Sequence, residues 1–482
     1  MLQTLVMKFG GTSVGSGPAI SQAVEVVKRA RGELAKHVVA VVSAMSGVTD
    51  LLQAGTLSAA SGDASRYREI AAVLRQKHGQ AAKMLLAQDA ASAMQEIEGL
   101  IDGYTLFCDS VRVLGEATPR ALDHTMGLGE RMSARLVAAA LRKAGLPSGA
   151  VDATRLIVTD ERFQNATPVP ELTVEKVRQV LNPLLYRGDI PVVTGFIGAT
   201  QAGVSTTLGR GGSDYTATLI GACLGSDEVW ILTDVDGVMS ADPRIVPEAH
   251  CVDSLSYREV SELAYFGAKV LHPKSIRPLL ETAIPLRVKN TFDPGHPGTL
   301  VRSNDTACDG VKAVTAISHV SLITVEGKGM LGVPGIAART FSAVAQAGTS
   351  VLLISQASSE QSICLAVPQE TAEMVAAAVS EGFERELVRR DIDRVHVQGD
   401  VTIVTVVGEG IRRNPRIAQR IFTATGQAGI DLIAIAQGSS DCGISLVVSA
   451  HQGEEALRAI HELTLNDRGS TTRKGASARE AK

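Results

Sequence analysis

The stretch Thr4-Leu-Val-Met-Lys-Phe-Gly-Gly-Thr-Ser-Val14 decides the fold prediction, because an apolar run of strand length ends directly in a pair of glycines. A helical pattern follows over residues 18–35, so the order is strand, tight turn and helix. Repetition of this order is typical of a parallel sheet covered by helices. We therefore predict an α/β fold with a mainly parallel three-layer α/β/α sheet, further strands at residues 37–43, 190–197 and 228–233, and a mostly helical insertion at residues 51–118.

The C-terminal part of the chain contains an internal repeat. The stretch that begins at Pro334 recurs at Pro415, and the corresponding pairs are Phe341 and Phe422, Gly348 and Gly429, and Gln356 and Gln437. Each copy has the order strand, helix, strand, strand, helix, which indicates a small ferredoxin-like module. One copy cannot cover both faces and edges of its sheet, so we expect the copies to pair with each other or with a second subunit.

These patterns suggest four segments. We predict a large N-terminal domain at residues 1–305, two modules at residues 315–392 and 393–466, and a tail at residues 467–482. The tail is polar and lacks periodicity, so we expect it to be disordered.

Composition argues against several classes of partner. Lys plus Arg total 47 against 51 for Asp plus Glu, and no basic block could follow a phosphate backbone, so nucleic acid is not expected. The apolar runs are too short to cross a bilayer, and Lys8 interrupts the N-terminal run before a secretory signal could form. The six cysteines include no CxxC pair, which is typical of reduced thiols. We expect a cytoplasmic protein without membrane contact.

Lys8 and the glycines after it form the first candidate site. Gly10 and Gly11 would let backbone amides approach a phosphate, and Lys8 could neutralise charge on a transferring phosphoryl group. The string is not a Walker A loop, which has the form GxxxxGK[ST]. A tight turn beside a solvated lysine is the alternative interpretation.

The second candidate is Thr206-Thr-Leu-Gly-Arg-Gly-Gly-Ser-Asp214, which leads into a predicted helix. A glycine-rich entry to a helix offers amides and the positive end of the helix dipole to an anion. Arg210 could grip a carboxylate through two parallel hydrogen bonds, and Asp214 could orient a catalytic lysine. Alternatively, Ser213 only caps a helix after a plain loop.

Three further segments carry polar groups. Glu130 lies in the first turn of a predicted helix and could receive an ammonium group, although first-turn glutamates are common on surface helices. Ser43 and Thr49 follow a buried strand, where their hydroxyls could bind substrate or complete a turn. Thr233-Asp-Val-Asp-Gly237 ends another strand; its DxDG string lacks full calcium-loop spacing, so a turn is favoured over a metal site.

Together these motifs resemble the aspartate kinases of the amino-acid kinase fold. The resembling strings occur in the family's order: KFGGTSVG at 8–15, GFIGATQAGVSTTLGRGGSDYTA at 195–217, LTDVDGV at 232–238, DPR at 242–244 and FGAKVLHP at 266–273. The C-terminal repeat resembles paired ACT domains, which bind amino-acid effectors. The resemblance extends over the chain to about residue 467.

The resemblance implies the following site. Lys8 would stabilise the transferring phosphoryl group, and Asp214 would organise the active site. Aspartate would be held by Ser43, Thr49, Glu130, Phe196 and Arg210, with Glu130 near the ammonium and Arg210 on the α-carboxylate. ATP would be held by Lys8, Gly10, Gly11, Thr233, Asp234, Arg244 and Lys269. Mg²⁺ would arrive with the nucleotide, without a dedicated protein metal site.

The implied reaction converts ATP and L-aspartate to ADP and 4-phospho-L-aspartate, the first step towards lysine, threonine and methionine. The β-carboxylate is already ionised at neutral pH, so it needs no general base before it attacks the γ-phosphate. Met239 stands where relatives often have an aromatic residue near the base, which leaves nucleotide preference open.

The resemblance also implies feedback regulation. Lysine-inhibited relatives carry an aspartate where this sequence has Leu352, whereas the QxSS strings at Gln356 and Gln437 resemble threonine-inhibited enzymes, including those fused to homoserine dehydrogenase. We therefore predict an effector site at Gln356 and Gln437, inhibition by threonine rather than lysine, and a homo-oligomer assembled through the ACT domains.

Two alternatives stay open at this point. One is another acid kinase of the same fold, acting on glutamate or N-acetylglutamate. The other is a catalytically inactive amino-acid sensor that uses only the repeat. The joint presence of Lys8, Glu130, Arg210 and Asp214 argues against the sensor.

Overall fold

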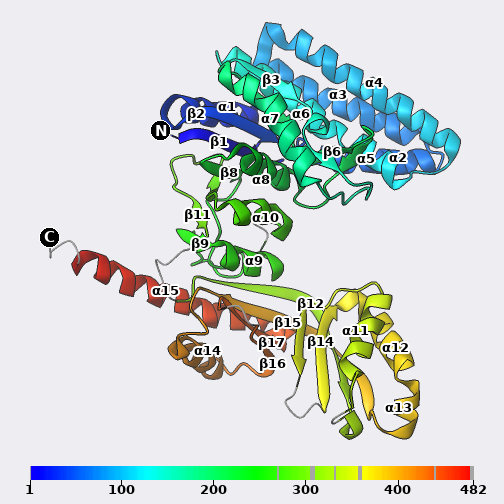
Figure 1. Cartoon of the computed structure of the whole chain (residues 1–482), viewed down its shortest axis with the longest axis vertical. Helices are drawn as coiled ribbons and strands as arrows, with labels where there is room; N and C mark the ends of the chain where they lie inside the picture. The colour runs from blue at the N-terminus through cyan, green and yellow to red at the C-terminus, as the bar shows by residue number, and fades with distance from the viewer. Residues whose placement is uncertain are drawn as a thin grey trace. The chain divides into compact units, whose positions relative to one another are not determined.

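A computed structural model of the chain describes residues 2–268, 271–303, 310–330, 333–356, 361–438 and 441–477, with side chains described up to Leu465. The chain forms two compact units (Figure 1). The first comprises residues 1–238, 253–257 and 270–304, and the second comprises residues 239–252, 258–269 and 305–482. The segments at 239–252 and 258–269 thus belong to the C-terminal unit, although they precede it in the sequence.

The first unit is built on an eight-stranded sheet in the order β3-β5-β2-β1-β8-β10-β11-β9. Neighbouring strands from β3 to β10 are parallel, and β11 runs antiparallel to β10. The strands of this sheet are β1 (Leu2–Phe9), β2 (Ala35–Val42), β3 (Ser148–Val151), β5 (Ile190–Thr194), β8 (Glu228–Thr233), β9 (Ser254–Ser256), β10 (Leu286–Asn290) and β11 (Thr299–Arg302). A small sheet contains β4 (Val158–Thr159), β6 (Ile197–Thr200) and β7 (Ser205–Thr207).

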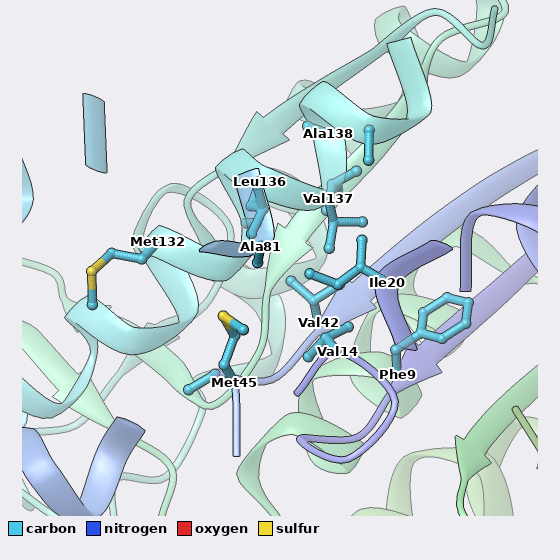
Figure 2. Close-up of a cluster of buried hydrophobic side chains, with 14 of the residues drawn as sticks. Phe9, Val14, Ile20, Val42, Met45, Ala81, Met132, Leu136, Val137 and Ala138 are labelled. Atoms are coloured by element: carbon cyan, nitrogen blue, oxygen red, sulfur yellow. The ribbon is translucent and has the colours of Figure 1, made fainter. Parts of the chain in front are cut away.

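Helices cover both faces of the large sheet. The helices of this unit are α1 (Gly17–Arg29), α2 (Val48–Ala60), α3 (Ala64–Leu86), α4 (Ala90–Leu114), α5 (Pro119–Met126), α6 (Leu128–Lys143), α7 (Pro170–Tyr186), α8 (Gly212–Leu224) and α10 (Pro273–Thr282). On one face, alternate residues of β1 pack with α1, α3 and α6 in one apolar cluster, and Figure 2 shows Phe9, Ile20, Val42 and Leu136 within it. Helix α8 contacts β1, β2 and β8 and packs on α7 and α10. This three-layer, mainly parallel fold confirms the predicted fold class, and α2 to α4 occupy the predicted helical insertion.

One predicted strand is interrupted. We expected a strand over residues 190–197, but β5 ends at Thr194 and β6 begins at Ile197. Phe196 between them has φ +69°, a left-handed conformation that ends a strand, and its amide donates to Thr216 Oγ1 at 3.1 Å. A Cβ on Gly195 would lie 2.7 Å from the Cβ of Ser213, so the turn can approach α8 closely only with glycine there.

The second unit contains a six-stranded sheet in the order β13-β14-β12-β15-β17-β16, in which neighbours are antiparallel. Its elements are α9 (Tyr257–Tyr265), β12 (Ala313–Glu326), α11 (Ile336–Gln346), β13 (Leu353–Gln356), β14 (Ser362–Pro368), α12 (Ala372–Gly382), α13 (Glu384–Arg389), β15 (Arg394–Val407), α14 (Pro415–Gln427), β16 (Leu432–Ala436), β17 (Gly443–Ser449) and α15 (Gly453–Ser477). The first residue of α9, Tyr257, is counted with the first unit, and the helix belongs to the second unit from Arg258 onward. The order strand, helix, strand, strand, helix occurs twice, as predicted. The long strands β12 and β15 pair along both modules, so the modules share one sheet.

The tail differs from its prediction. We expected disorder over residues 467–482, but the backbone of α15 is helical through Ser477, and residues 478–482 lie outside the described residues. A helix that has already started needs only one further hydrogen bond per added residue, so it can continue without an apolar stripe. Among the helices described, none combines the length and apolar composition needed to span a membrane.

Candidate active site

All five predicted substrate residues line one cavity of about 380 Å³ at the carboxyl ends of the parallel strands of the first unit. This edge is where open α/β sheets usually bind ligands. The predicted residues that line it are Lys8, Gly11, Ser43, Thr49, Glu130, Phe196, Arg210 and Asp214. The structure brings these residues together, and their individual roles stay predictions.

The glycine turn after β1 is held closely against neighbouring strands. The Gly10 amide donates to the Leu232 carbonyl at 3.0 Å, and the buried Ser13 hydroxyl lies 2.6 Å from Thr291 Oγ1. A Cβ on Gly11 would lie 3.3 Å from the Ala44 carbonyl oxygen. The turn therefore packs against the loop after β2, and a larger residue at position 11 would push the two apart.

Lys8 and Asp214 form a partly shielded ion pair. Lys8 Nζ lies 2.6 Å from Asp214 Oδ1, and the side chains are only 11% and 14% exposed. Lys8 comes from the end of β1, and Asp214 lies in the first turn of α8, where the helix dipole favours a negative charge. This pair places a positive charge at the cavity wall and fixes its position.

Glu130 is buried without a full set of partners. It is 3% exposed, and its Oε1 accepts from the Ala44 amide at 3.1 Å, while Oε2 has no partner among the described residues. Burial raises the pKa of Glu130 to about 7. A Cβ on Gly129 would lie 2.7 Å from the Ala44 Cβ, so the preceding glycine lets α6 approach this loop. The carboxylate is thus ready to receive a cation inside the cavity.

Arg210 supplies a positive charge to the cavity, opposite in sign to the carboxylate of Glu130. It is exposed between Gly209 at φ +78° and Gly211 at φ +70°, conformations that favour glycine. Within the part of the chain that the structure describes, no hydrogen bond or ion pair holds its guanidinium. A Cβ on Gly211 would lie 2.6 Å from the His272 Cβ, so α10 packs directly against this turn.

Asp123 supports the arginine loop, and sequence reasoning missed it. The carboxylate is 1% exposed and accepts from the Gln164 amide, the Thr207 amide and the Thr207 hydroxyl at 2.7 to 3.0 Å. Burial raises its pKa above the ordinary range. These bonds join α5 to β7 immediately before Arg210. The sequence shows only that Asp123 lies seven residues before Glu130. This spacing does not predict a structural role for Asp123 unless the fold is known.

Replacing Asp123 with alanine should leave the buried amide and hydroxyl of Thr207, and the less buried amide of Gln164, without their acceptor. We expect the free energy of unfolding to fall by ~3 kcal/mol, because each orphaned buried donor costs roughly 1–3 kcal/mol. The loop that carries Arg210 should also loosen. Urea unfolding followed by circular dichroism measures the loss, and the exposed Glu116→Ala variant is the control. Equal stability of the two variants would contradict this account.

The predicted nucleotide residues divide between the units. Thr233 is the last residue of β8 in the first unit, and its hydroxyl donates to Oδ1 of the following residue, Asp234, at 3.1 Å. Arg244 belongs to the second unit, and its guanidinium lies 2.6 Å from Asp242 Oδ2. Lys269 lies outside the described residues. Sequence reasoning did not foresee that the segment with Arg244 and Met239 would join the C-terminal unit.

That segment is anchored in the core of the second module. Ala241 and Val246 belong to the apolar cluster that contains Ile460 of α15. The buried Ser240 hydroxyl lies 2.8 Å from Nε2 of His461, also on α15. The segment that carries Arg244 is therefore continuous with the packing of the repeat.

The predicted effector residues occupy matching places in the two modules. Gln356 ends β13, and Gln437 follows the last residue of β16; both are exposed. The Ser355 hydroxyl donates to the Ile435 carbonyl at 3.3 Å, so β13 and β16 lie side by side. The two matching loops thus leave neighbouring strands.

Comparison with known proteins agrees with this architecture. The model of the amino acid kinase family matches residues 3–290, and an ACT domain model matches residues 323–383 and 404–463. Aspartokinase 3, chloroplastic, of Arabidopsis thaliana is 35% identical over 95% of this chain and 81% of the relative. Bifunctional aspartokinase/homoserine dehydrogenase 1, chloroplastic, of the same plant is 36% identical over 95% of the chain. The chain spans 50% of that bifunctional relative.

A solved structure extends the likeness to three dimensions. Aspartokinase III of E. coli, in complex with aspartate and ADP, has a TM-score of 0.79 and 27% identity, covering 96% of this chain and 100% of that one. The chain belongs to the amino acid kinase family, and within it to the aspartokinases that carry C-terminal ACT domains. This confirms the resemblance predicted from the sequence.

Proposed function

We propose that the chain phosphorylates the β-carboxylate of L-aspartate with ATP and releases 4-phospho-L-aspartate and ADP. The observation that carries the proposal is one cavity that holds a fixed cation, a buried carboxylate and a free arginine. The complex of E. coli aspartokinase III with aspartate and ADP supports the choice of both substrates.

In this proposal the two ends of the amino acid are recognised by opposite charges. Glu130 receives the ammonium group, which supplies the missing partner for its buried carboxylate. Arg210 binds the α-carboxylate, because no partner among the described residues competes for its guanidinium. Ser43 and Thr49 add hydroxyl contacts at the loop after β2, and Phe196 closes the wall beside them.

The transfer itself needs positioning and charge neutralisation. The ionised β-carboxylate attacks the γ-phosphorus in line, the bond to the β,γ-bridging oxygen breaks, and ADP leaves with the electron pair. Lys8 stabilises the charge on the transferring group, and Asp214 holds the ammonium of Lys8 in place. The Gly11 amide approaches the phosphates, whereas the Gly10 amide already donates to the Leu232 carbonyl and supports the turn. Thr233, Asp234, Arg244 and Lys269 hold the nucleotide, and Mg²⁺ comes with it.

Other acids of similar shape are the second candidates. N-acetylglutamate has no ammonium group, so it would leave the Glu130 carboxylate buried and unpaired. Glutamate differs from aspartate by one methylene, which typically changes kcat/KM by about 10- to 200-fold. ADP release measured with each of the three acids tests the assignment. Turnover with N-acetylglutamate at the aspartate rate would refute the role of Glu130.

We further propose that the ACT unit makes the enzyme subject to amino-acid feedback. Leu352, which is partly buried just before β13, offers no charge to a lysine side chain, whereas Gln356 and Gln437 offer amides suited to a hydroxyl. The segment that carries Arg244 packs in the same unit as these modules. We also propose that the chain forms a homo-oligomer through its ACT domains, as predicted from the sequence.

Threonine should therefore inhibit the kinase, and lysine should not. Activity is measured at fixed ATP and aspartate while each amino acid is titrated, and Gln356→Ala and Gln437→Ala variants are titrated in parallel. We expect a roughly tenfold or larger rise in the threonine concentration needed for half inhibition, because each lost hydrogen bond leaves a polar group of the effector unpaired. Inhibition by lysine alone would refute the assignment. Synthesis of lysine, threonine and methionine is the metabolic role that this regulation fits.

A further inference from the structure

A second cavity lies on the first unit, along one face of the large sheet, and shares no lining residue with the candidate active site. It has a volume of about 760 Å³ and lies where Leu2 begins β1 and Glu228 begins β8. The last turns of α1 and the loop at residues 294–297 complete its walls. None of the residues assigned to aspartate or ATP lines it.

The cavity contains three cations, two of which are already paired. Arg287 Nε lies 2.6 Å from Glu228 Oε1, and Arg29 Nε lies 3.0 Å from Glu33 Oε2. The third, Lys289, is 6% exposed, and its Nζ donates to the His296 carbonyl. Among the residues described, no carboxylate forms an ion pair with it. Lys289 is therefore a buried ammonium whose direct partner among the described residues is a neutral carbonyl and not a carboxylate, which is a costly state.

Trp230 forms the wall beside this ammonium. Lys289 Nζ lies 5.3 Å from the centre of the Trp230 ring, within the range of a cation–π interaction. The indole is 9% exposed, and its N–H has no partner in the described part of the chain. The indole N–H is thus a buried donor without an acceptor beside the ammonium of Lys289, which is unusual in a folded protein.

The electrostatic environment of Lys289 favours an anion. Burial lowers the pKa of Lys289 below its ordinary value, and the positive charges of Arg287 and Arg29 lower it further, while Glu228 and Asp293 raise it. A bound anion would oppose all three effects that lower this pKa. The rest of the wall is apolar at Leu2, Val26, Ala30, Leu34, Pro294 and Pro297, and its further polar members are Gln22 and the exposed Glu25.

We propose that this cavity binds a small organic carboxylate with an apolar or aromatic body. The carboxylate accepts hydrogen bonds from the ammonium of Lys289, and the body lies against Trp230 and Val26. One unpaired cation matches a single negative charge better than a phosphate dianion, because the two arginines already have carboxylate partners. The apolar lining favours an organic body over an inorganic ion.

The sequence contains one tryptophan, so the fluorescence of Trp230 reports directly on this cavity. The full chain, without ATP or aspartate, is titrated with phenylacetate, with its neutral analogue phenylacetamide and with inorganic phosphate. We expect a saturable change with phenylacetate, and at least tenfold weaker binding of the amide and of phosphate. A kinase assay is not needed, so failure here would leave the proposed aspartate kinase activity unaffected, and failure of that activity would leave this test unaffected.

Single-residue variants test whether phenylacetate binds in this cavity or associates non-specifically with the protein surface. Lys289→Met keeps the length of the side chain and should weaken phenylacetate binding at least tenfold, while the exposed Lys28→Met should leave it unchanged. Should Lys289→Met fail to fold, the exposed Arg29→Glu should still weaken binding severalfold by adding a negative charge. The proposal would be overturned if phenylacetamide bound as tightly as phenylacetate, if phosphate bound and phenylacetate did not, or if no saturable change occurred. It would also be overturned if a folded Lys289→Met or Arg29→Glu variant bound phenylacetate as tightly as the wild type.

Discussion

Replacing Lys8 with methionine is expected to lower kcat for aspartate-dependent ATP turnover by roughly 10³-fold, at the upper end for loss of one preorganised donor to a transition state. The methionine keeps the length of the side chain but removes the charge that faces the transferring phosphoryl group. The KM values should change much less than kcat, because the charge matters most where negative charge develops. Steady-state rates at saturating ATP and aspartate measure the effect.

Two controls distinguish lost chemistry from lost folding. Lys36→Met changes an exposed lysine on β2 and should keep full activity. The double variant Lys8→Met, Asp214→Asn removes the carboxylate that the single variant leaves unpaired, so it should be more stable than the single variant but no more active. Full turnover by Lys8→Met would refute the catalytic assignment.

Replacing Glu130 with glutamine should raise the KM for aspartate by roughly 30-fold or more, because loss of one partner of a buried charge pair commonly costs about 2–5 kcal/mol. Glutamine has nearly the same shape but cannot neutralise the substrate ammonium. The kcat should fall less than the affinity. An unchanged KM would show that the ammonium binds elsewhere.

The same variant should alter the dependence of stability on pH. Burial raises the pKa of Glu130 in the folded chain from 4.5 to about 7, so the folded state binds a proton more tightly than the unfolded state. The associated stability is present below pH 4.5 and is lost as pH rises through 7. Glu130→Gln lacks this loss, so at pH 8 it should be more stable than the wild type by ~3 kcal/mol.

Aspartate should bind more tightly to the wild type as pH rises through 7, because the ammonium group needs the ionised carboxylate of Glu130. Thermal unfolding and aspartate binding, each measured across pH 5–9 for both proteins, test these expectations. Parallel pH profiles for the wild type and Glu130→Gln would contradict them.

Much of the fold could be predicted from local patterns in the sequence. The apolar run before Gly10 and the helical pattern after it predict a strand and a helix that both form, and the Gln356 and Gln437 repeat predicts two modules of the observed order. Glycine-rich strings also identify the cavity, since Gly11, Gly209 and Gly211 are needed where backbones approach closely or φ is positive. These signals are local, which is why a single sequence carries them.

The remaining features depend on contacts between distant residues. Asp123 is an ordinary helical aspartate until the fold brings Gln164 and Thr207 to its carboxylate. Phe196 breaks a predicted strand because its amide is held by Thr216 of a later helix. The segment around Ser240 joins the C-terminal unit through His461, more than two hundred positions along the chain. Periodicity within a window of sequence contains none of this information.

The most direct test of the account is to trap the product. The purified chain is incubated with ATP, Mg²⁺ and L-aspartate in the presence of hydroxylamine, which converts an acyl phosphate to a hydroxamate that mass spectrometry can identify. The account predicts aspartate β-hydroxamate, formed only when ATP and aspartate are both present and strongly reduced in Lys8→Met. Absence of a hydroxamate with aspartate, together with its formation from another acid, would contradict the substrate assignment and leave the fold standing.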